Sequence, residues 1–189
     1  VTLTAYMQSH VLLGLHKSLD CWCCDIANNP DFEAGVQNWN AMQALLKCVG
    51  RELANSFLLL NAMAVVGLAC FLTSCATIVL SDESRRLALL AEGLPSLPLL
   101  FIFLLSMRVF AHAAALTEKC RSIPAFVNQI PTQNCCDPSR QYLVTYIADS
   151  AAGFSVLNMK VTAEMLVRQA SFLSSIVSCL VGVLSTTFL

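Results

Sequence analysis

Clustered cysteines are the residues of this sequence best suited to metal or redox chemistry. The chain has ten cysteines; Cys21, Cys23 and Cys24 form a C-W-C-C motif, and Cys135 and Cys136 are adjacent. A zinc site normally has C-x₂-C pairs repeated at a defined interval, and neither cluster has that spacing. We therefore predict no metal site and no cofactor. The thiols then have either no specific role or become palmitoylated beside a membrane.

Two ionisable residues lie inside an apolar stretch. Arg108 and His112 are four residues apart and therefore share one face of a helix. An ionisable group within a membrane span often marks a functional site. Both residues lie in the last third of their stretch, where the Arg108 side chain can reach the membrane surface. His112 is a candidate for a pH-sensitive group.

Small and hydroxylated residues recur along the last apolar stretch. Ser178, Gly182 and Ser185 follow one another at steps of four and three, which places them on one helix face. Such residues leave room and offer dipoles, as an ion path requires, but they also allow close helix packing. We take the three as ion-pathway candidates and keep helix packing as the alternative. The sequence has no nucleotide-binding, metalloprotease or serine-hydrolase motif, so we expect no enzyme.

The amino-acid composition indicates the kind of fold that holds these residues in place. Of 189 residues, 57% are hydrophobic and 12% are charged, whereas about 25% are charged in a typical soluble domain. We therefore predict an all-α, polytopic transmembrane bundle. The net charge is −1 and there is no basic cluster, which argues against a nucleic-acid partner. The expected partner is the lipid bilayer.

Long apolar stretches define the expected spans, since about 20 residues cross a bilayer. The chain begins inside an apolar stretch, so we expect it to be the C-terminal part of a longer protein. The expected segments are the end of a truncated span at 1–15, a cytoplasmic helix at 31–55, spans at 56–80 and 94–116, a cytoplasmic helix at 139–171 and a last span at 172–189.

A helical seam precedes the span at 56–80. Apolar residues recur there at steps of three and four, after a start signal at Pro30 and Asp31, and this pattern predicts one helix from about 31 to 80 that packs against other helices. We take the cytoplasmic part of the seam as a subunit contact. Its members are Val36, Trp39, Met42, Leu46, Val49 and Leu53.

A second helical pattern precedes the last span. It follows an irregular, proline-containing region at 123–138 and runs from about 139 to 169, with Tyr142, Tyr146, Phe154, Leu157 and Val161 as apolar markers. Gly153 is expected to be a kink or a close contact. Basic residues near the span ends favour the side carrying 16–55 and 117–171 as cytoplasmic.

The C-terminal region resembles the end of insect-type gustatory receptors and their relatives. Gly153, Phe154 and Asn158 match a Gly-Phe segment followed by an Asn, and Ser178-Cys179, five hydrophobic residues and Ser185-Thr186 occupy the family's last motif. The resemblance implies a homo- or hetero-tetrameric, ligand-gated cation channel in the plasma membrane, gated by a small molecule, with its C-terminus outside. It places Ser185 at a pore-lining position and Gly182 at the hydrophobic gate.

Two other classes of protein fit the sequence. A secondary transporter could build a midplane site from Asn61, His112 and the helix start at 95–98, although we find no internal repeat. A membrane scaffold protein without transport activity would use the helical seam to bind its partners. A fourfold assembly would favour the channel over both.

Overall fold

The chain folds into long helices joined by one short hairpin. The computed structural model describes residues 1–80, 97–131, 137–157 and 159–187. The all-α prediction is confirmed, since five helices account for most of these residues. The elements are α1 (Thr2–Asn28), α2 (Phe32–Leu80), α4 (Leu97–Gln129), α5 (Pro138–Ser150), β1 (Ser155–Val156), β2 (Met159–Lys160) and α6 (Ala163–Thr187).

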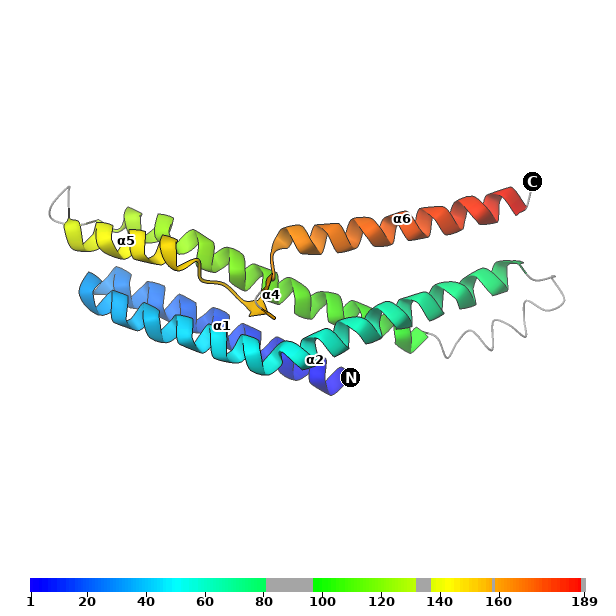
Figure 1. The fold of residues 1–189 in the computed structure, drawn as a ribbon, viewed down its shortest axis with the longest axis horizontal. Coiled ribbons are helices and arrows are strands. Elements are labelled where there is room, and N and C mark those ends of the chain that lie inside the picture. Colours follow the sequence, from blue (N-terminus) through cyan, green and yellow to red (C-terminus); the bar gives the residue numbers. More distant parts are fainter. Residues whose placement is uncertain (81–96, 132–136, 158, 188–189) are drawn as a thin grey trace.

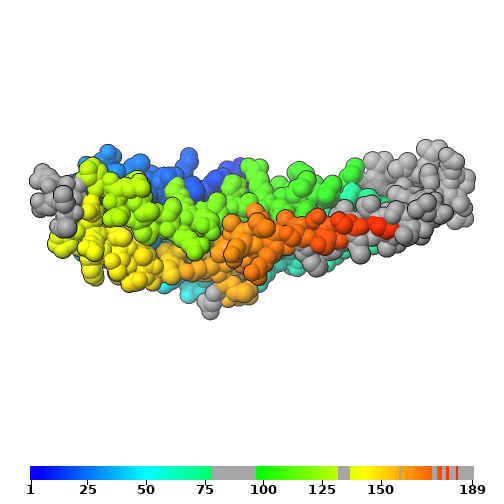
Figure 2. Space-filling view, turned by 90° about the horizontal axis from the view of Figure 1, so that it is seen from above, coloured from blue at the N-terminus to red at the C-terminus, as the bar shows by residue number. Residues whose placement is uncertain are grey.

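Four helices form a bundle at one end of an elongated molecule (Figure 1). It consists of α1, the first half of α2, the second half of α4, and α5. Trp22 of α1 and Trp39 of α2 pack against each other in its buried core, with ring centroids 5.2 Å apart. Seen from above, α5, the hairpin and the start of α6 follow one another beside α4 (Figure 2).

The first helix extends beyond the apolar stretch expected at 1–15. It is continuous to Asn28 because Leu12, Leu15, Leu19, Trp22 and Ile26, at alternating steps of three and four, form a buried stripe. The segment from 16 to 28, to which no element was assigned, is therefore part of the bundle.

The second helix is a single element of 49 residues. The start signal is confirmed, because the Asp31 carboxylate accepts a hydrogen bond from the Ala34 amide at 3.0 Å, as an N-cap residue does. The two helices α1 and α2 are thus antiparallel neighbours joined by residues 29–31.

The prediction of an irregular region at 123–138 is wrong for the first half of that region. Helix α4 continues through Pro124 to Gln129, although a proline inside a helix costs about 3 kcal/mol. The buried stripe of Leu116, Cys120, Ile123 and Val127 extends on both sides of the proline. Its burial offsets that cost, at roughly 1.5–3 kcal/mol for each large side chain.

The helix expected over 139–171 is also wrong. Helix α5 ends at Ser150, where Ala151 takes a left-handed conformation (φ 47°, ψ 41°), and a hairpin follows with Ser155 opposite Lys160. Of the apolar markers, Phe154 and Val161 are buried, but Tyr142 and Leu157 are about 60% exposed. The face of α5 that packs on the bundle carries Leu143 and Ile147 instead.

Candidate functional site

The described part of the molecule has a charged end, which contains the four-helix bundle, and an uncharged end. Beyond Glu52 in α2, before Arg108 in α4 and beyond Arg168 in α6, the described residues carry no charge. These three uncharged segments project from the same end of the bundle (Figure 1). The boundaries of α2 and α4 lie close together, because the Phe57 and Phe110 rings are 5.8 Å apart. Among the described helices, α2 and α4 are long and apolar enough to cross a membrane.

The ion-pathway candidates lie on α6 in the uncharged end. Ser178 is exposed, and a Cβ atom on Gly182 would meet no atom within 4 Å. Ser171, Ser174 and Ser175 are exposed on the same face, so the described part of this face consists of small residues. Ser185 belongs to α6, but its side chain lies outside the described part of the structure, as do Asn158 and the pair Cys135–Cys136.

The predicted subunit contact requires a correction. Trp39 and Leu46 are fully buried within one chain, and Trp39 donates a hydrogen bond to Ser150 Oγ of α5 at 3.1 Å. The seam is therefore part of the chain's own core, and these two side chains are not available to a second subunit. The remaining members are half-buried against the same core: Val36, Met42, Val49 and Leu53.

Polar side chains join three helices near the boundary between the two ends. Gln8 of α1, only 2% exposed, donates to Ser56 Oγ of α2 at 2.8 Å. Ser106 of α4 donates to Asn61 Oδ1 of α2 at 3.1 Å. Asn61 is therefore engaged in helix packing. His112 lies six residues beyond Ser106 along α4, or about 9 Å, so the structure does not bring the two transporter candidates together.

The described cysteines are not gathered into a group of potential metal ligands. Cys21 and Cys24 are exposed and Cys120 is buried, and no group of three or more potential ligands occurs among the residues described. Burial raises the pKa of the Cys23 thiol. Nearby, Lys119 donates a hydrogen bond to Asp20 and lowers the pKa of that carboxyl.

The hairpin is clamped between α2 and α4, a feature that the sequence did not reveal. A Cβ atom on Gly50 would lie 2.5 Å from the Ser155 carbonyl oxygen, so only glycine lets β1 approach α2 this closely. On the other side, Thr117 Oγ1 accepts a hydrogen bond from the Phe154 amide at 3.1 Å. Gly153 makes the close contact expected of it, because its Cβ would lie 2.9 Å from the Thr117 methyl.

No protein-family model, curated protein or solved structure matches the chain.

Proposed function

We propose that the chain is part of a subunit of a ligand-gated cation channel of the gustatory-receptor kind. In this proposal the uncharged end lies in the plasma membrane, the bundle is cytoplasmic and the C-terminus is outside. The observation that carries the proposal is the arrangement of α2, α4 and α6. Their uncharged segments project from the same end of the four-helix bundle, which carries the charged residues. The segment in α6 exposes a face of small residues.

Exposed apolar side chains support the membrane part of the proposal. Only 28% of the most apolar segment of α2 and 33% of that of α4 are buried within the chain, whereas the core helix of a soluble protein is mostly buried. Leu59, Val66, Phe101 and Leu104 are each more than half exposed in the uncharged end. Exposed large apolar side chains that gather at one end of a protein mark membrane or protein interfaces, and lipid covers them in the proposed arrangement.

The length and surface of α6 support its role as the pore helix. From Gln169 to Thr187 it has 19 residues without a charge, which span about 28 Å and match the hydrocarbon core of roughly 30 Å. Four copies of its small-residue face around a central axis would line a path with hydroxyl dipoles.

The four-helix bundle supports the assembly part of the proposal. Since Trp39 and Leu46 are used within the chain, tetramer contacts must come from the bundle's outer surface. Leu45 on α2 and Phe126 on α4 are large apolar residues exposed there. In this proposal, a small-molecule ligand opens the channel.

Opposite charges at Ser178 test the pore. The full-length protein is purified into planar bilayers, and basal openings are recorded across a KCl gradient. In a tetramer, Ser178→Asp puts a ring of four carboxylates on the path and raises the cation-to-anion permeability ratio, whereas Ser178→Lys lowers it. A folding defect would change the number of openings for both variants but would not shift the reversal potential in opposite directions.

Thr73 of α2 provides the matched control. It is exposed in the uncharged end, and its hydroxyl is bonded to its own helix at Cys70. Thr73→Asp and Thr73→Lys should leave the reversal potential unchanged. Equal shifts from both positions, or a wild-type protein that never conducts, would contradict the proposed pore.

A further inference from the structure

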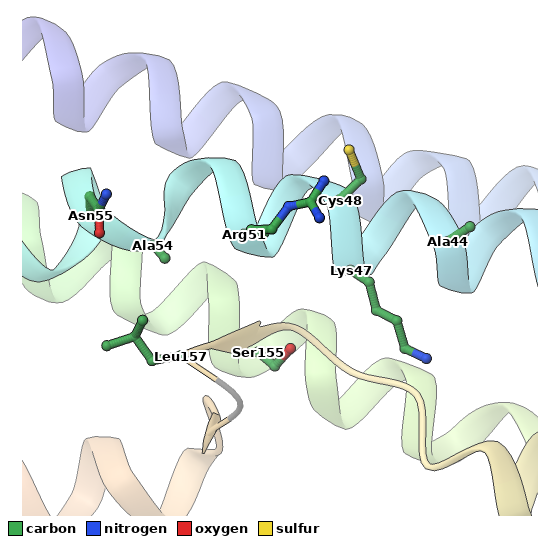
Figure 3. A pocket seen from close by; sticks show the side chains of 8 residues that line it. All are labelled: Ala44, Lys47, Cys48, Arg51, Ala54, Asn55, Ser155 and Leu157. Atoms are coloured by element: carbon green, nitrogen blue, oxygen red, sulfur yellow. The ribbon is translucent and has the colours of Figure 1, made fainter.

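A row of polar residues runs along one face of α2 beside the hairpin. Gln43, Lys47, Arg51 and Asn55 are spaced four residues apart and therefore form one line on the helix. They line two adjoining grooves between α2 and the hairpin segment, of about 600 and 160 Å³. Figure 3 shows Lys47 extending from α2 toward the chain segment that precedes the hairpin, with Ser155 and Leu157 on the facing wall.

The grooves are rich in positive charge and in hydrogen-bond donors. Lys47 lines both grooves from α2, Arg51 lines the larger one from the same helix, and Lys160 lines the smaller one from β2. Among the described residues, the only ion pair of these three is Arg51 with Glu52 at 3.9 Å, and both side chains are more than 70% exposed, so it is weak. Gln43 Nε2 is a buried donor with no partner among the atoms described.

Carboxylates do not cancel this charge. Asp149 of α5 lines a neighbouring groove with Lys47. Glu118 of α4 lines another with Lys160 and Arg121. Glu52 lies next to Arg51 but lines neither of the two grooves. The two grooves themselves are thus lined, among the described residues, by three cations and no carboxylate, and the carboxylates lie in the grooves beside them. A ligand with several anionic oxygens would complement this surface.

The position of the grooves specifies the kind of anion. The larger groove reaches the boundary between the charged and uncharged ends, since its lining residue Asn55 is three residues beyond the last charge of α2. The hairpin beside the grooves exposes Leu157 and Met159 to about 60% each. A free phosphate would use only the cations, whereas a lipid would also cover the two apolar side chains.

We propose that these grooves bind the headgroup of an acidic phospholipid in the cytoplasmic leaflet. Lys47, Arg51 and Lys160 contact the phosphate oxygens, and Leu157 and Met159 pack against the upper acyl chains. The proposal rests on the membrane arrangement given under the proposed function. Since the site joins α2 to the hairpin, a bound lipid fixes the segment that leads into α6.

Binding of dioctanoyl phosphatidic acid to the full-length protein in a neutral detergent tests the proposal. Affinity is measured by thermophoresis at about 0.1 M salt, where screening extends over ~10 Å. Dioctanoyl phosphatidylcholine and inorganic phosphate are the comparison ligands. Each basic residue near a lipid surface contributes about fivefold in affinity, so Lys47→Ala with Arg51→Ala is expected to weaken phosphatidic acid binding about 30-fold.

The matched control removes the same charge elsewhere on the bundle. Lys17 of α1 and Arg140 of α5 line neither of the two grooves nor the one that Lys160 shares with Arg121, so Lys17→Ala with Arg140→Ala should retain the wild-type affinity. Equal losses in the two double variants would overturn the inference. So would inorganic phosphate binding as tightly as the lipid, or phosphatidylcholine binding as well as phosphatidic acid.

Failure of this inference is distinguishable from failure of the proposed function. The double variant at Lys47 and Arg51 leaves the α6 face intact, so basal conductance is read independently. A protein that binds phosphatidic acid selectively but never conducts would overturn the channel and retain the lipid site. A protein that conducts but shows no preference for the acidic lipid would overturn the lipid site alone.

Discussion

The contact between Gly50 and the hairpin gives the sharpest prediction about this fold. Replacing glycine by alanine inside a helix normally stabilises it by about 1 kcal/mol. At Gly50 the new methyl would lie 2.5 Å from the Ser155 carbonyl oxygen. That atom belongs to the backbone of a strand that is hydrogen-bonded to β2, so it cannot move like the tip of a flexible side chain.

The magnitude follows from the balance of the two effects. Overpacking in a well-packed site costs about 1–3 kcal/mol, which exceeds or cancels the gain in helix propensity. Gly50→Ala is therefore expected to lower the free energy of unfolding by about 0–2 kcal/mol. Gly14→Ala is the control, since a Cβ atom there meets nothing within 4 Å and should raise it by up to about 1 kcal/mol.

Hydrogen exchange locates the effect as well as its size. In Gly50→Ala, amides of the hairpin segment should exchange faster, including that of Val161, which is bonded to the Phe154 carbonyl at 3.0 Å. The bundle amides of α1 should be unchanged. A Gly50→Ala protein as stable as Gly14→Ala, with the same protection at 151–161, would refute the close-approach argument.

Two further predictions concern the bundle itself. Trp39→Ala removes a fully buried side chain and should destabilise the protein by about 3–5 kcal/mol in denaturant unfolding. Asn38→Ala, at an exposed position of the same helix, should change stability by only about 0.5 kcal/mol. Similar losses in the two variants would contradict the assignment of Trp39 to the core. Because the Lys119 hydrogen bond lowers the pKa of Asp20 below its ordinary 3.8, its stabilisation is present above that pH and is lost as the pH falls through the folded-state pKa. Asp20→Asn should reduce this acid sensitivity of the unfolding midpoint, and a variant with the wild-type pH profile would exclude the ion pair as its cause.

The sequence predicts the long elements of this fold better than their partners. The apolar seam of α2 and its Asp31 cap follow from local spacing and capping chemistry, and both are found. The spacing also shows that Trp39 and Leu46 are buried, but it cannot say against what. Their partners in α1 and α5 come from distant parts of the chain, so burial within one subunit and burial between subunits give the same pattern.

The sequence does not predict the hairpin, because the apolar residues of this segment have the spacing of a helical face. Phe154, Leu157 and Val161 are spaced by three and four, as on a helical face. Tertiary contacts decide the conformation. Phe154 is fully buried, with its ring 6.2 Å from that of Phe57. Gly50 and Gly153 allow the hairpin segment to approach α2 and α4 closely. A useful local signal is Gly153, followed by the aromatic Phe154 and the β-branched Val156, which are residue types that favour strands.

The clamped hairpin bears directly on how α6 could move in the proposed channel. Helices α2 and α4 run from the polar bundle into the uncharged end without a break, so they connect the two ends as stiff rods. The last helix is different, because it joins the bundle through the hairpin and residues Val161 and Thr162. Any rotation of α6 that opens a path along Ser178 must therefore bend this junction or release the contacts at Gly50 and Thr117. If the contacts are released, Gly50→Ala should raise the basal open probability in the same bilayer recordings; if openings are unchanged while the hairpin exchanges faster, α6 rotates at the junction and the clamp only holds the bundle together.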